Sequence, residues 1–80
     1  MTEPEKKRAE KFTTAIDEII KNGIEKNHHS LALKLGTYSH IIVRIRNLKS
    51  NPSRNLFEAL IKNYNVDANF LFGKSENIFL

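Results

Sequence analysis

The side chains best able to bind an anion or to donate hydrogen bonds to a partner are concentrated between residues 24 and 55. This segment carries six lysines and arginines and one glutamate, for a net charge of +5, together with all three histidines. Residues 1–23 have no net charge, and residues 56–80 have a net charge of −1. Such a patch suits a polyanion, above all nucleic acid, but a solvated basic surface is also common on small domains. Charge alone leaves both explanations open.

Four side chains in this segment have the chemistry needed to read the edges of base pairs. Arg44 can donate two hydrogen bonds to O6 and N7 of guanine, and Ser39 and His40 can each donate or accept one. Tyr38 offers a hydroxyl group and an aromatic ring, although a half-buried aromatic residue of the core is the other explanation for it.

The sequence contains no arrangement typical of catalysis or of metal binding. His28 and His29 are adjacent, so they point about 100° apart around a helix, and neither has a ligand-type partner four residues on. Asp17 and Glu18 are most simply the solvated edge of a helix. No Ser/His/Asp set and no glycine-rich phosphate loop stands out either, so we expect no enzyme, no cofactor and no metal site.

The composition predicts a cytoplasmic protein. The chain has no cysteines, which suits a reducing compartment. No apolar run approaches the ~20 residues that span a bilayer, so no membrane association is expected. The charged N-terminus is not followed by the apolar stretch of a secretion signal. A length of 80 residues predicts one domain, residues 1–80, with one modest core.

The elements that must position these side chains are predicted to be helices. The first begins at Thr2 and Glu5, which have capping-box spacing, and ends at Asn22-Gly23. Its apolar face is formed by residues that recur with helical spacing, namely Phe12, Ala15, Ile16, Ile19 and Ile20. A second helix is predicted between Asn27, its N-cap, and Gly36, which stops it. Its buried residues are Leu31, Ala32 and Leu35.

Residues 38–47 could form a strand or a helix, because Ile41, Ile42 and Val43 are β-branched. Nothing else in the chain alternates with period two, and a lone strand would leave its backbone groups unpaired. We therefore predict a helix. Its inward residues are Ile42 and Ile45, and its outward residues are His40, Val43, Arg44 and Asn47.

Two further helices complete an all-α prediction with no sheet. Residues 49–53 form a loop that ends in Ser53, the N-cap of a fourth helix. Its apolar stripe is Leu56, Phe57, Leu60, Ile61 and Tyr64. Asp67 caps a short fifth helix, which contains residues 70–72 and ends at Gly73.

Two helices joined by a tight turn with a glycine form a helix-turn-helix, whose second helix lies in the major groove of DNA. Residues 27–73 resemble a lambda-repressor-like domain of the Cro and phage-repressor family. The matching features are Leu31-Ala32 before Gly36, buried Ile42 and Ile45, the segment 44–49 (RIRNLK), Asn51-Pro52-Ser53, and Val66-Asp67 through Gly73. The resemblance implies a compact five-helix domain with the helix-turn-helix motif at about residues 27–49.

The resemblance also implies roles for individual residues. The recognition helix would be Tyr38–Asn47, with Tyr38, Ser39, His40 and Arg44 at base-reading positions. Asn27, His28, Asn47 and Lys49 would lie at phosphate-contacting positions. Independently of the resemblance, the two-sided geometry of the helix would let Ile41 and Val43 flank the groove-facing side and touch thymine methyl groups or sugar edges. The chain departs from the family at Arg46 and Leu48, where glutamate and glycine are usual. The resemblance therefore does not determine how this helix ends.

The expected function is sequence-specific binding of double-stranded DNA by a transcriptional regulator, by the family's usual role a repressor. One recognition helix spans too few base pairs to specify a site, so we expect a homodimer on a palindromic operator. Residues 78–80 (Ile78, Phe79 and Leu80) are candidates for the dimer contact. The alternative is a protein–protein interaction module on the same fold, which would use Ile41, Val43, Leu48 and the same tail.

Overall fold

The longest helix, α1 (Glu3–Lys21), forms because its N-terminus is capped and one of its faces is apolar. In the computed structural model, which describes residues 2–80, the predicted capping box is present. The backbone N–H of Thr2 donates to Glu5 Oε1 at 2.9 Å, and the N–H of Glu5 donates to Thr2 Oγ1 at 3.3 Å. Phe12, Ile16 and Ile19 are fully buried, so this face forms one wall of the core.

Helices α2 (His28–Lys34) and α3 (Ser39–Arg46) are joined by a turn of four residues, 35–38. Asn27 caps α2 as predicted, because its side-chain oxygen accepts the N–H of Ser30 at 2.9 Å. Gly36 has a φ of +78°, a left-handed conformation that glycine adopts without steric cost and that lets the chain turn. The predicted choice of helix over strand is confirmed for residues 39–46, and Ile42 and Ile45 are buried.

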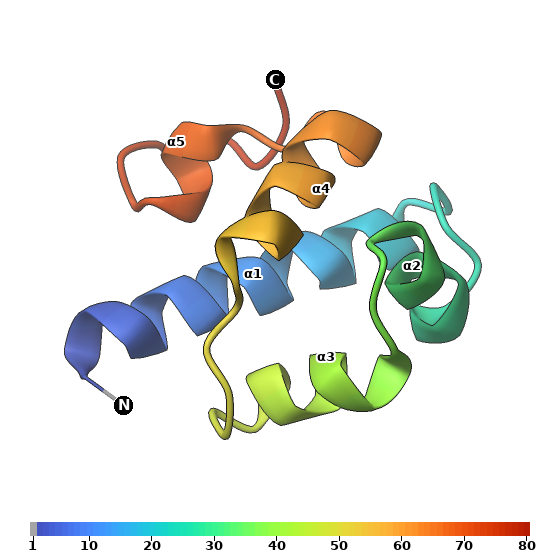
Figure 1. Cartoon of the computed structure of the whole chain (residues 1–80). Coiled ribbons are helices and arrows are strands. Elements are labelled where there is room, and N and C mark those ends of the chain that lie inside the picture. Colours follow the sequence, from blue (N-terminus) through green and yellow to red (C-terminus); the bar gives the residue numbers. More distant parts are fainter. Residues whose placement is uncertain (1) are drawn as a thin grey trace.

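Helices α4 (Arg54–Tyr64) and α5 (Ala68–Leu71) complete the core. Ser53 and Asp67 cap them as predicted. Figure 1 shows α3 along the edge of the molecule opposite to α5 and the C-terminus. All five helices bury side chains, and residues 2–80 contain no strand beyond one isolated bridge, so the all-α prediction is confirmed. None of the helices in residues 2–80 has the length and apolar character needed to cross a bilayer.

Three apolar residues considered as outer or dimer-contact residues are partly buried against the core, which corrects the outward placement of Ile41. Ile41 lies beside Ile42 at the margin of the buried face of α3, so it is only partly exposed. Ile78 and Phe79 are held by the backbone, since the tail forms an antiparallel bridge between Val66 and Phe79. Only the last residue of the tail, Leu80, is largely exposed.

The end of α3 has the geometry that glycine usually provides, although Leu48 occupies the position. Leu48 has a φ of +58°, and the N–H of Lys49 donates to the carbonyl of Arg44 at 2.8 Å. The N–H of Leu48 donates to the carbonyl of Ile45 at 3.0 Å, which completes a Schellman motif. A left-handed residue other than glycine costs roughly 1–2 kcal/mol. The helix therefore ends in a Schellman motif although Leu48 replaces glycine, and the backbone of Leu48 is strained.

Candidate nucleic-acid interface

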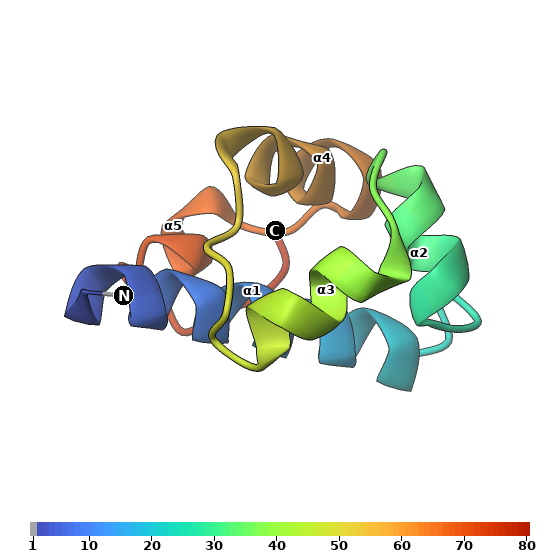
Figure 2. The same ribbon diagram turned by 60° about the horizontal axis from the view of Figure 1, so that its bottom comes forward.

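The outer face of α3 is a stripe of four exposed side chains on a helix whose other face is fixed to the core. His40, Val43, Arg44 and Asn47 recur at i, i+3, i+4 and i+7, so they lie on one side of the helix, as predicted. Figure 2 shows α3 across the front of the molecule with no other element lying over it. A partner can therefore approach this stripe along its whole length.

Tyr38 and His40 form a stacked pair at the N-terminal end of this stripe. Their ring centroids are 5.7 Å apart and their planes differ by 8°. Tyr38 is the N-cap of α3 and is 65% exposed, so the half-buried core position that we considered for it was wrong. Ser39, the first residue of α3, is partly buried beside them. The structure thus brings together three of the four residues expected at base-reading positions.

The fourth of these residues, Arg44, is directed toward the loop that follows α3. Its Nε donates to Ser50 Oγ at 3.1 Å, and its Nη2 lies 3.5 Å from the carbonyl oxygen of Lys49. Arg44 is exposed on the outer face, and these contacts hold its guanidinium group at the loop. Ser50 was not among the predicted site residues, because a serine in a polar loop gives no sign of which side chain it contacts.

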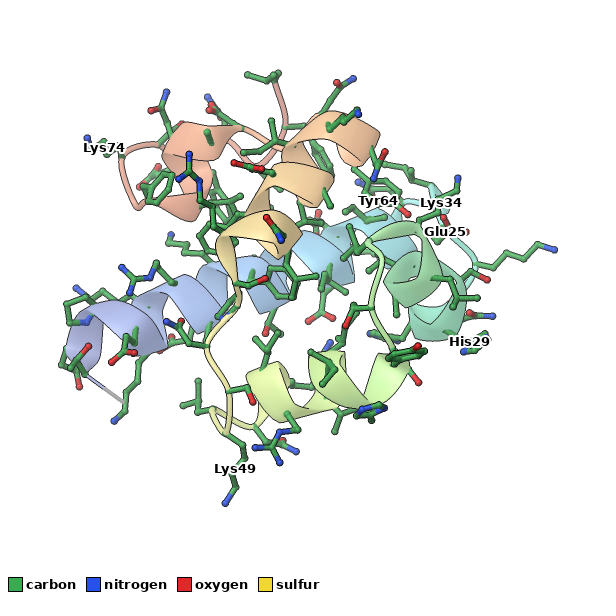
Figure 3. The ribbon with its side chains drawn as sticks, viewed as in Figure 1. Glu25, His29, Lys34, Lys49, Tyr64 and Lys74 are labelled. Carbon is green, nitrogen blue, oxygen red and sulfur yellow. The ribbon has the colours of Figure 1, made fainter. Side chains whose placement is uncertain are left out.

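The four residues expected at phosphate-contacting positions are all exposed and lie at the ends of the two helices. Asn27 and His28 begin α2, and Asn47 and Lys49 follow the end of α3. In Figure 3 the side chain of Lys49 extends away from the body of the molecule beyond α3. The first turn of α2 adds backbone N–H groups and the positive end of its dipole, which favour an anion.

An ion pair that the sequence did not reveal fixes α3 to α1. The guanidinium group of Arg46 donates to Asp17 through Nη2–Oδ1 at 2.6 Å and Nη1–Oδ2 at 3.2 Å. His28 Nε2 lies 3.2 Å from Arg46 Nη2 and 3.8 Å from Asp17 Oδ1. Asp17 is exposed, as expected for the solvated edge of a helix, but it is also paired with Arg46. One ring nitrogen of His28 is also engaged here, which leaves its predicted phosphate contact to the other nitrogen.

The bidentate contact changes the protonation equilibria of both partners. Its hydrogen bonds lower the pKa of Asp17 and raise the pKa of Arg46, with opposing contributions from partial burial. The pair joins residues 29 positions apart, and it holds the C-terminal end of α3 in place at the surface. Arg46 thus positions α3 rather than facing a partner.

Replacing Asp17 with Asn should lower the free energy of unfolding by about 0.2–1 kcal/mol at neutral pH, the range for an ion pair this exposed. The pKa of Asp17 is lower in the folded state, so its contribution is present above the unfolded-state pKa and is lost as the pH falls through the folded-state pKa. Urea unfolding of both proteins should give a difference at neutral pH that shrinks toward zero in acid. Glu18→Gln, at the neighbouring position, is the control and should show neither effect. A difference that persists undiminished in acid would contradict the ion-pair assignment.

A second polar contact anchors the loop before α2 to α4. The hydroxyl group of Tyr64 donates to Glu25 Oε2 at 2.9 Å, and Lys34 Nζ lies 3.7 Å from the same oxygen. These three residues are labelled together in Figure 3. Burial, and then the neighbouring Glu25 carboxylate, raise the pKa of Tyr64 well above its usual value. Tyr64 therefore stays protonated, and it holds the segment that leads into α2.

Away from α3, two hollows flank Phe72, which is 59% exposed. The larger has a volume of about 550 Å³ and is lined by Arg54, Phe57 and Glu58 among others. The smaller, of about 280 Å³, lies against the N-terminal half of α1. In the described part of the chain, residues 2–80, no three metal-ligating side chains are grouped as a metal ion would require.

No protein-family model matches this chain, and no curated protein or solved structure is significantly similar to it.

Proposed function

We propose that this chain is a sequence-specific regulator that binds double-stranded DNA through a helix-turn-helix of the lambda-repressor-like type. In this proposal α2, the turn of residues 35–38 and α3 are the motif, α3 enters the major groove, and the expected role is repression. The observation that carries the proposal is the two-sided character of α3. One side is buried in the core, while the other presents hydrogen-bonding and apolar side chains within the segment of net charge +5.

The way α3 is held supports this role. A helix that reads base edges must keep its side chains in fixed positions, which requires rigid attachment to the scaffold. Ile42 and Ile45 attach its inner face, and the Arg46–Asp17 pair attaches its C-terminal end. The stacked rings of Tyr38 and His40 restrain each other at its N-terminal end.

Phosphate contacts would come from both sides of the helix. Asn27 and His28, at the start of α2, would meet one strand, and Asn47, Lys49 and the loop after α3 would meet the other. Such contacts provide much of the affinity and fix the orientation, whereas the outer stripe of α3 would supply the sequence preference.

A matched pair of charge reversals tests the proposal. Lys49→Glu and Lys74→Glu change the net charge equally, but Figure 3 places the two lysines at opposite ends of the molecule. Lys49→Glu should weaken binding of a random-sequence duplex by roughly tenfold, because it replaces a phosphate contact with repulsion, and Lys74→Glu by less than about twofold. Fluorescence anisotropy at low salt measures both. Equal losses in the two variants, or no binding by the unmodified chain, would overturn the proposal.

We further propose a symmetric homodimer on a palindromic operator, with a contact different from the one expected from sequence. Ile78 and Phe79 are used within the domain, whereas Phe72 is exposed beside a hollow lined by Arg54 and Glu58. In a two-fold contact, residue i of the first copy meets residue j of the second copy, and residue j of the first copy meets residue i of the second. Arg54 and Glu58, which pair within α4 at 3.1 Å, could therefore also pair between copies.

Footprinting of a selected operator should show two protected half-sites about 34 Å apart, one helical turn, related by dyad symmetry. Phe72→Ser should reduce the protection to a single half-site at the same protein concentration, because it removes the apolar contact but leaves α3 intact. A single short patch with the unmodified chain would rule out the dimer. Two half-sites that persist in Phe72→Ser would rule out this surface.

The second candidate function is an interaction module that binds another protein, and the exposed Phe72 favours it too. The two functions differ in what they require of α3. Loss of duplex binding in Lys49→Glu supports the DNA-binding function, because a protein-binding role for the Phe72 surface makes no use of Lys49.

A further inference from the structure

Only one apolar side chain lies in the outer stripe of α3. Val43 is 52% exposed at the middle of this stripe, between the imidazole of His40 and the carboxamide of Asn47. Ile41, which was expected on the groove-facing side as well, is partly buried against the core. Val43 therefore meets any partner of α3 without a second aliphatic side chain beside it.

Both arginines of α3 have hydrogen-bond partners within the domain. Arg44, although on the outer face, donates to Ser50 in the following loop, and Arg46 is paired with Asp17 on α1. The loop that holds the Arg44 guanidinium group would lie beside a sugar–phosphate strand in the proposed complex. This placement favours a backbone contact for Arg44 over the guanine contact expected from the sequence.

The major groove offers one kind of apolar group on the base edges, the 5-methyl group of thymine. When a valine on the groove-facing stripe packs against a methyl group at the same depth, apolar surface of both groups is removed from water, which favours binding. A cytosine amino group or a purine acceptor there would lose water without gaining a hydrogen bond from Val43.

We propose that Val43 contacts the 5-methyl group of thymine, so that each half-site carries a T·A pair opposite the middle of α3. This inference rests on the proposed DNA binding. Val43 selects the pair by apolar contact, while Arg44 binds the backbone and contributes equally to all sequences.

The methyl group can be removed from the DNA without changing its hydrogen-bonding pattern. A pool of duplexes is first enriched from a random library with the unmodified chain and is then prepared in two forms, one with thymine and one with deoxyuridine in its place. The unmodified chain should bind the deoxyuridine form about fourfold more weakly for each contacted methyl group. Val43→Ala should bind the thymine form more weakly than the unmodified chain does, and it should bind the two forms about equally. Alanine is a better helix former than valine, so this variant keeps α3 folded.

Arg44→Ala is the matched control. It should weaken binding to both forms by the same factor and keep the preference for thymine. Equal affinity of the unmodified chain for both forms would overturn the inference while leaving the proposed DNA binding intact. A thymine preference that survives undiminished in Val43→Ala would also overturn it, because another residue would then contact the methyl group. No enrichment of any duplex would overturn the proposed function itself.

Discussion

Raising the salt concentration from 50 to 200 mM should weaken the binding of duplex DNA by roughly 10³-fold. Each phosphate that a basic side chain neutralises releases condensed counterions, and the log–log slope is about −0.9 per phosphate. Arg44, Lys49 and the start of α2 would account for about three phosphates per protomer, hence about six for a dimer and a slope near −5. This is the largest effect that we expect for this protein.

Titration of a random duplex at several salt concentrations gives this slope directly. Lys49→Glu should make it shallower by about one for each protomer bound, whereas Lys74→Glu should leave it unchanged. A flat response to salt would contradict a phosphate-binding surface at the ends of α2 and α3, even if some binding were observed. A steep slope that neither variant changes would place that surface elsewhere on the chain.

Replacing Phe12 with Ala should lower the free energy of unfolding by about 3–5 kcal/mol. Phe12 is fully buried on α1, and its ring lies 6.1 Å from that of Phe57 on α4, so its removal opens a cavity between the two helices. A domain of 80 residues has a total stability of only about 4–12 kcal/mol. Thermal unfolding followed by circular dichroism should show the midpoint lowered by about 15 °C or more.

Phe72→Ala is the matched control for this prediction. Phe72 also contacts Phe57, edge-on with centroids 5.8 Å apart, but it is 59% exposed. The same substitution there removes a similar ring without leaving a closed cavity, so it should cost about 1 kcal/mol or less. Equal destabilisation by the two variants would contradict the assignment of Phe12 to the core and Phe72 to the surface.

The sequence by itself determined the local structure of this protein. Caps at Thr2, Asn27, Ser53 and Asp67 and the spacing of apolar residues predicted five helices, and all five are present. These signals are contained within about one turn of helix, so they can be recognised without knowing how the helices pack. The concentration of positive charge in residues 24–55 is likewise a property of the sequence alone.

Tertiary structure decided which of the candidate side chains are available to a partner. Asp17 and Arg46 are 29 residues apart, and Glu25 and Tyr64 are 39 apart, so neither contact leaves a local pattern. The path of the loop after α3 turned Arg44 toward Ser50. Ile41 was predicted to be an outer residue because hydrophobic periodicity marks the centre of a buried face and not its margins. At the margins, packing against other segments determines the burial of each side chain, as it also does for Ile78 and Phe79.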